Sequence, residues 1–156
     1  MRLFYWTAAC LFVLDQLTKY YVVHVMDLRL LGRIDVLPPY FNLRMAWNTG
    51  INFGILAGDA PLTRWILIGV ALLISGAVLW WVHREPLGRL QRIAAGLLLG
   101  GALGNVIDRV IYGAVADFLN MSCCGLDNPY VFNVADIAVF AGAFGLVLAP
   151  ARKNPS

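Results

Sequence analysis

The chain has 156 residues, of which 60% are hydrophobic and only 13% are charged. Soluble domains average roughly 45–50% apolar and about 25% charged residues, so this composition cannot cover a soluble core with polar surface and indicates a bilayer protein. The 12 Lys and Arg residues outnumber the acids and give a formal net charge of +3. They are scattered singly, which argues against a nucleic-acid partner.

Four apolar stretches predict transmembrane helices, because a helix needs about 20 apolar residues to cross the hydrocarbon core. No small-residue cleavage site follows the first stretch, so we expect an uncleaved helix and not a signal peptide. The sequence shows no repeat and no second domain, and it predicts one all-α membrane domain over residues 1–156. The expected helices are residues 3–25, 64–82, 90–112 and 131–149.

The distribution of Lys and Arg predicts the orientation of these helices. Residues 1–2, 83–92 and 151–156 contain six of them in 18 positions, whereas residues 25–64 and 113–132 contain four in 60 positions. Cytoplasmic loops carry the excess of positive residues. Both termini are therefore expected in the cytoplasm, and the two sparse loops outside it.

The first outer loop mixes turn formers with residues that favour strands, among them Val36, Tyr40, Phe41, Trp47 and Phe53. It predicts a small β-rich cradle on the outer membrane surface over about residues 33–58. Glycines at positions 50, 54 and 58 suggest, as a further hypothesis, that part of this loop moves over the site.

Polar side chains gather at one depth of the predicted bundle. Ionisable residues inside a membrane are costly and by default indicate a partner, a water-filled cavity or a working site. Here three helices and the second outer loop bring polar residues toward the outer surface: Asp15, Lys19, Asn105, Asp108, Arg109, Asp117, Asn133 and Asp136. Asp15 and Lys19 are also four residues apart on one helix, so they could simply neutralise each other.

Glycines spaced four residues apart, at positions 96, 100 and 104, predict close approach of a neighbouring helix. We expect no metal ion and no cofactor. His24 and His83 lie at opposite membrane faces, so they cannot share a metal site or a catalytic triad. Cys123 and Cys124 are adjacent and are expected to be loop thiols.

The remaining candidates for chemistry are two carboxylates, Asp117 in the outer loop and Asp136 at a helix start. Two carboxyls that face each other cannot both ionise readily, so they share a proton. The ionised member can deprotonate a water while the protonated member donates to a peptide carbonyl. A proton-coupled carrier or an assembly subunit could use the same buried carboxylates as a proton relay, and this alternative stays open from the residues alone.

Five motifs in order along the chain resemble those of bacterial lipoprotein signal peptidase, signal peptidase II. They are Asp15–Lys19 (DQLTK), Asn48–Gly54 (NTGINFG), Gly101–Arg109 (GALGNVIDR), Val115–Phe118 (VADF) and Phe132–Asp136 (FNVAD). The resemblance implies a four-helix aspartyl endopeptidase of the bacterial cytoplasmic membrane that acts as a monomer. It also implies cleavage before a diacylglyceryl-modified cysteine of a prolipoprotein, contact with membrane lipid, and inhibition by the cyclic peptide globomycin.

Carried over by position, the resemblance makes Asp117 and Asp136 the catalytic pair. The resemblance and the polar cluster together predict a set of supporting or substrate-binding residues: Asp15, Lys19, Asn48, Gly50, Asn105, Asp108, Arg109 and Asn133.

Overall fold

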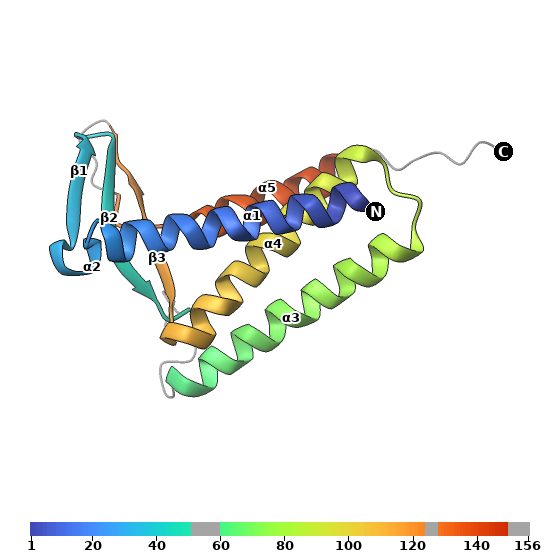
Figure 1. Ribbon diagram of the computed structural model, residues 1–156, viewed down its shortest axis with the longest axis horizontal. Coiled ribbons are helices and arrows are strands. Elements are labelled where there is room, and N and C mark those ends of the chain that lie inside the picture. Colours follow the sequence, from blue (N-terminus) through green and yellow to red (C-terminus); the bar gives the residue numbers. More distant parts are fainter. Residues whose placement is uncertain (51–59, 124–127, 150–156) are drawn as a thin grey trace.

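The computed structural model describes residues 1–50, 60–123 and 128–149. Four long helices run side by side, and a three-stranded sheet stands across one end of them (Figure 1). The start of α1 and the turn between α3 and α4 lie at the opposite end (Figure 1). The sheet therefore lies at one end of the molecule, and the α3–α4 turn lies at the other.

Helix α1 covers Arg2–Tyr20 and continues as a π-helical turn, Tyr21–Val25. Asp27 then adopts a positive φ of 52° and precedes the single turn of α2, Leu28–Leu31. Gly32, at φ 73°, leads into the first strand. These two residues with positive φ break the helix and turn the chain from the bundle into the sheet.

Strands β1 (Arg33–Leu37) and β2 (Phe41–Asn48) form an antiparallel hairpin, and β2 pairs on its other edge with β3 (Val115–Met121). A bulge interrupts the β2–β3 register between Leu43 and Ala46. Leu43 and Phe118 pack with Val22 and Leu28 into a buried cluster that joins the sheet to the end of α1. The sheet is thus held against the bundle by apolar contacts.

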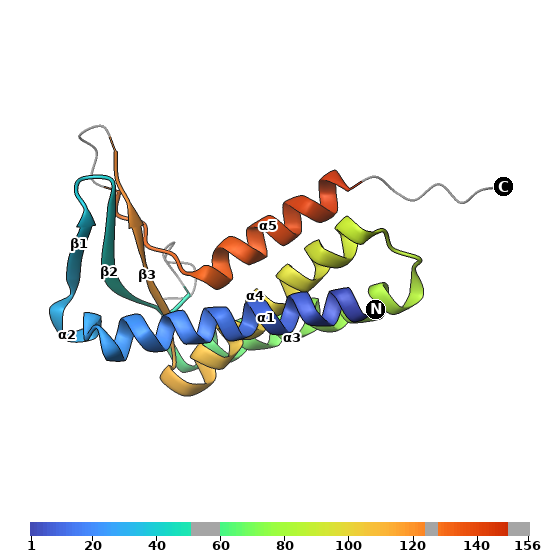
Figure 2. The same cartoon turned by 45° about the horizontal axis from the view of Figure 1, so that its top comes forward.

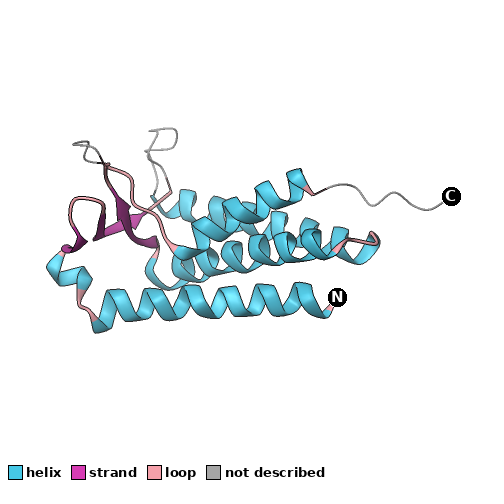
Figure 3. Cartoon of the chain, turned by 90° about the horizontal axis from the view of Figure 1, so that it is seen from above, coloured by secondary structure: helices cyan, strands magenta, loops and turns pink. Residues whose placement is uncertain are grey.

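Helices α3 (Ala60–Arg84), α4 (Arg89–Tyr112) and α5 (Val134–Leu148) complete the bundle. Helix α4 is central, because α1, α3 and α5 all pack on it. Figures 2 and 3 show α1 and α5 lying along α4 from different sides. Within the part of the chain that the structure describes, two segments, Leu62–Arg84 and Arg89–Tyr112, are long and apolar enough to cross a bilayer by themselves. Helix α5 is a shorter apolar helix.

The structure corrects two expectations and adds one element. Asp117 belongs to strand β3, not to a loop, because residues 115–121 pair with β2. The last helix begins at Val134 and not at residue 131, because Asn133 is its N-cap. The short helix α2 was not expected. Of the anticipated mobile loop, Gly54 and Gly58 lie outside the described residues, as does Cys124.

Close helix approach at the spaced glycines is confirmed. A Cβ atom on Gly96 would lie 2.8 Å from the carbonyl oxygen of Phe4, and one on Gly100 would lie 2.5 Å from that of Ala8. Both carbonyls belong to α1. Such positions admit no larger residue without backbone movement, so these glycines set the distance between α1 and α4.

We predict that Gly100→Ala lowers the free energy of unfolding by about 1–3 kcal/mol, the usual cost of overpacking a well-packed contact. Gly69→Ala on α3 is the matched control, because a Cβ there meets nothing within 4 Å. Thermal unfolding in detergent micelles measures both. Equal melting temperatures for the two variants would contradict this account.

Candidate active site

Asp117 and Asp136 are brought together by Asn133. The Asn133 side-chain Nδ2 donates to Asp117 Oδ1, and the Asn133 backbone N–H donates to Asp136 Oδ2 at 3.3 Å. Asn133 is fully buried. One residue that donates to both carboxyls therefore brings the two side chains close together.

The start of α5 orients Asp136. Asn133 is the N-cap, and its Oδ1 accepts from the Asp136 backbone N–H at 2.8 Å. Together with the reverse bond to Asp136 Oδ2, this is a capping box, which satisfies two otherwise unpaired donors of the first helical turn. The second oxygen of Asp136 accepts from Asn105 Nδ2 of α4 at 2.9 Å.

Strand pairing positions Asp117. Ala46 of β2 lies opposite Asp117 in the sheet, and Asn48 at the end of β2 donates through Nδ2 to Asp117 Oδ2 at 3.0 Å. Gly50 holds Asn48 in turn, because its backbone N–H donates to Asn48 Oδ1 at 2.8 Å. Gly50 has φ 99°, and a Cβ at this position would collide with the side chain of Leu67.

The two carboxyls differ in environment. Asp117 is only 2% exposed, whereas Asp136 is partly exposed. Burial raises the pKa of Asp117 from 3.8 to about 6, and the nearby charge of Asp136 adds to the increase. Hydrogen bonds from Asn48 and Asn133 and the charge of Lys19 oppose it. Asp117 is therefore the carboxyl suited to hold a proton at mildly acidic pH.

A buried ionic cluster lies behind the pair. Lys19 Nζ is 2.8 Å from Asp15 Oδ2 and 2.8 Å from Asp108 Oδ2, and all three side chains are at most 5% exposed. The predicted Asp15–Lys19 pair exists, but Lys19 also binds Asp108 on α4 and donates to Asn105 Oδ1 at 3.2 Å. Asp15 and Asp108 accept from the backbone N–H groups of Ala135 and Ala116, respectively.

Arg109 lies near the two carboxyls, but its hydrogen bond goes to a backbone carbonyl. Its Nη1 donates to the Asn105 backbone carbonyl at 3.3 Å, and it interacts electrostatically with Asp136 and Asp117. No ion pair joins Arg109 to either carboxylate among the described residues. Its buried Nε has no hydrogen-bond partner among the residues that the structure describes.

Sequence reasoning missed one polar member of the cluster. Gln16 donates through Nε2 to Asp15 Oδ2 and to Asp108 Oδ1, both at 3.1 Å, and so links α1 to α4. Its position inside the Asp15–Lys19 motif was a signal, since Gln16 directly follows an expected site residue in the polar segment that comes after the apolar part of this helix.

Comparison with known proteins identifies the family. Residues 7–151 match the family model of signal peptidase (SPase) II. The chain belongs to the signal peptidase II family. It is 42% identical to the lipoprotein signal peptidase of a Methylobacterium species over 91% of this chain and 84% of that protein. A Nostoc relative with the same name is 40% identical over 99% and 93%.

Two solved structures described as bacterial membrane enzymes share the fold. One superposes with a TM-score of 0.78 at 29% identity and covers 95% of this chain and 92% of its own. The other has a TM-score of 0.74 at 30% identity, with coverages of 91% and 83%. Membership in a peptidase family favours the peptidase over the carrier or assembly subunit that the residues alone left open.

We predict that Asp136→Asn lowers the pKa of Asp117 from about 6 while leaving it above 3.8, because the neighbouring charge disappears but burial, the larger cause, remains. A ¹³C NMR titration of labelled aspartate carboxyl carbons measures this. The exposed Asp35, on β1, supplies the control variant Asp35→Asn, which should leave the pKa unchanged. An unaltered Asp117 pKa in Asp136→Asn would contradict the electrostatic interaction.

Proposed function

We propose that Asp117 and Asp136 form the catalytic pair with which this signal peptidase II removes signal peptides from prolipoproteins. The observation that carries this proposal is the double donation by Asn133, which holds one carboxyl through its side chain and the other through its backbone. Two carboxyls in one site, one buried and one partly exposed, supply an acid and a base without a metal ion.

The proposed reaction begins with a water molecule at the carboxyl pair. Ionised Asp136 removes a proton from the water, the water oxygen bonds to the scissile carbonyl carbon, and protonated Asp117 donates its proton to the carbonyl oxygen. The resulting diol collapses as Asp136 returns its proton to the leaving nitrogen, the C–N bond breaks, and a diol proton returns to Asp117. Bound substrate excludes water and raises the pKa of Asp117 further, which keeps the acid protonated.

The proposed substrate is a prolipoprotein whose cysteine already carries diacylglyceryl, cut on the N-terminal side of that cysteine. Each buried methylene contributes about 0.8 kcal/mol to membrane anchorage, so such a substrate must reach the enzyme laterally from the bilayer. Membrane lipid is then a direct neighbour, and a globomycin-type cyclic peptide would compete for the same site. We expect the enzyme to act as a monomer.

The proposed topology has four transmembrane helices, α1, α3, α4 and α5, with both termini in the cytoplasm of a bacterium. Asp117 lies in β3 and Asp136 in the first turn of α5, whereas α3 ends at Arg84 and α4 begins at Arg89, next to the α3–α4 turn. The sheet and this turn lie at opposite ends of the bundle (Figure 1). The positive end faces the cytoplasm, which puts the sheet, as an extracytoplasmic cradle, and the active site near the outer surface.

We predict that Asp117→Asn and Asp136→Asn each abolish cleavage, because each replaces a carboxyl that gives and takes a proton by an amide of nearly equal volume that does neither. The assay uses purified enzyme and a diacylglyceryl-modified precursor, with and without globomycin. Asp35→Asn, far from the pair on the edge strand, should cleave at the wild-type rate. Turnover by either pair variant at more than background would refute the catalytic assignment.

We also predict that Arg109→Lys lowers kcat/KM about tenfold or more, because a point charge cannot copy a planar guanidinium that interacts electrostatically with both carboxyls and donates to the Asn105 carbonyl. Arg84→Lys, exposed at the far end of α3, is the matched control. Wild-type kinetics in Arg109→Lys would remove this residue from the site.

A further inference from the structure

Three asparagine amides donate to the carboxyl pair, and in each the carbonyl oxygen has its own donor. The Asn48 oxygen accepts from the Gly50 backbone N–H, and the Asn133 oxygen accepts from the Asp136 backbone N–H. The Asn105 oxygen accepts from Lys19 Nζ at 3.2 Å and from the Asn133 amide at 3.3 Å. Lys19 thus donates to the oxygen of Asn105, just as backbone N–H groups donate to the oxygens of Asn48 and Asn133.

An ammonium group imposes a direction on a carboxamide. It carries three N–H donors and no acceptor, so only the oxygen of Asn105 can face it favourably. The reversed amide would place its NH₂ group against Lys19 and its oxygen against the Asp136 carboxylate, which already has a 2.9 Å bond from Asn105 Nδ2. Asn133 supports the same orientation with a neutral donor, which is weaker than a charge-assisted one.

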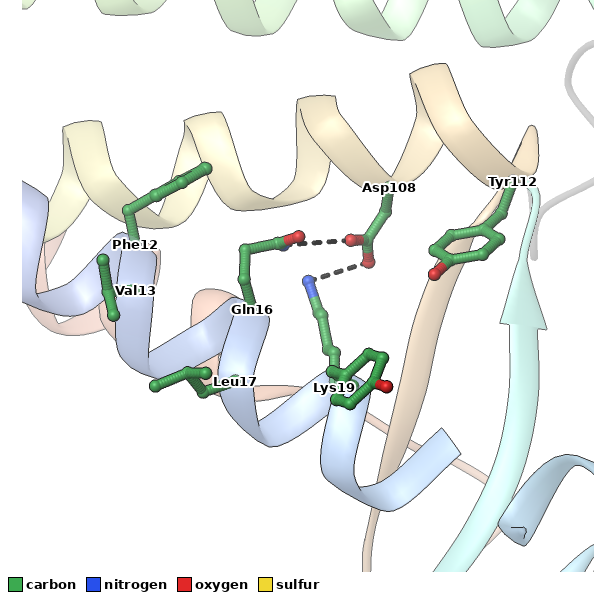
Figure 4. A pocket seen from close by; sticks show the side chains of 8 residues that line it. Phe12, Val13, Gln16, Leu17, Lys19, Asp108 and Tyr112 are labelled. Carbon is green, nitrogen blue, oxygen red and sulfur yellow. Dashed lines mark hydrogen bonds and ion pairs between the residues drawn. The ribbon is translucent and has the colours of Figure 1, made fainter. Parts of the chain in front are cut away.

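Lys19 is fixed in turn by two carboxylates. Its ammonium binds Asp15, Asp108 and Asn105, so each of its donors has a partner. Figure 4 shows the side chains of Lys19 and Gln16 reaching from α1 to Asp108 on α4. The cluster carries two negative charges and one positive charge, and both helices contribute to it.

We propose that Lys19 is a positioning residue of the peptidase: its buried ammonium holds the Asn105 carboxamide with the N–H directed at Asp136. Lys19 acts through Asn105 and does not touch the substrate. This proposal rests on the function proposed above for Asp117 and Asp136.

A cavity lies beside Lys19. A pocket of about 330 Å³ lies between α1 and α4 and is bordered by Lys19, Gln16, Leu17, Tyr20, Asp108 and Tyr112, among others (Figure 4). A truncated residue at position 19 would therefore leave a space that small amines can reach.

The first test compares two variants that differ only at position 19. Lys19→Met alone leaves two buried carboxylates without a cation, which is expected to destabilise the fold. The Lys19→Met/Asp108→Asn double variant keeps the native net charge of the cluster but lacks the donor to Asn105, whereas Asp108→Asn keeps Lys19. We expect kcat of the double variant to fall about tenfold or more below that of Asp108→Asn, with KM nearly unchanged and with similar melting temperatures.

The second test restores the missing donor. In Lys19→Ala/Asp108→Asn, propylammonium replaces the lost side-chain atoms from Cγ to Nζ and should restore kcat in a concentration-dependent manner. Tetramethylammonium is the control, because it has the same charge but no N–H group. Rescue by propylammonium alone supports orientation of Asn105 through a hydrogen bond.

The outcomes separate this proposal from the one on which it rests. Activity of Asp117→Asn would overturn the catalytic pair itself. An inactive Asp117→Asn together with equal kcat in Asp108→Asn and the double variant would contradict only the role of Lys19. Equal rescue by the two cations, or no rescue of the folded variant by propylammonium, would also contradict that role.

Discussion

The structure depends on supplying hydrogen-bond donors to two neighbouring carboxyl groups, one buried and one partly exposed. An unpaired buried carboxylate is expensive, and two that lie close repel each other. The protein meets this demand with neutral amides from three different elements: the end of β2, the middle of α4 and the start of α5. Neutral donors stabilise the carboxylates without the strong pKa depression that a direct ion pair would cause, so Asp117 keeps its raised pKa.

The packing of the helices brings the amides of Asn48, Asn105 and Asn133 to the carboxyl pair. Glycines on α4 let α1 approach closely, and a Cβ on Gly104 would collide with the Asp15 carboxylate. The ionic cluster of Asp15, Lys19 and Asp108 then ties α1 to α4 in one register. Backbone donors from Ala116 and Ala135 tie the same cluster to β3 and α5, so the helix contacts, the sheet and the site support each other.

Much of this arrangement could be predicted from sequence, because intramembrane charges and spaced glycines carry a local signal. The apolar stretches gave helices near their true positions, and the polar residues of the site were named from their shared depth and from motif resemblance. The strand containing Asp117 could not be found in this way, since its pairing partner β2 is about 70 residues away and its own segment is short. The partners of Asp108 and the hydrogen bond from Arg109 to the Asn105 carbonyl depend on the directions of the side chains, which residue spacing on a helix does not fix.

The order of elements along the chain has a consequence for biosynthesis. Asp117 lies in β3 and Asp136, with its cap Asn133, opens α5, while α1 supplies Lys19 and Asp15 from an earlier part of the chain. A nascent chain that contains only α1, α3 and α4 lacks both carboxyls. The proposed catalytic pair is therefore assembled only after α5 has been made, later than the cluster of Asp15, Lys19 and Asp108 that α1 and α4 already supply.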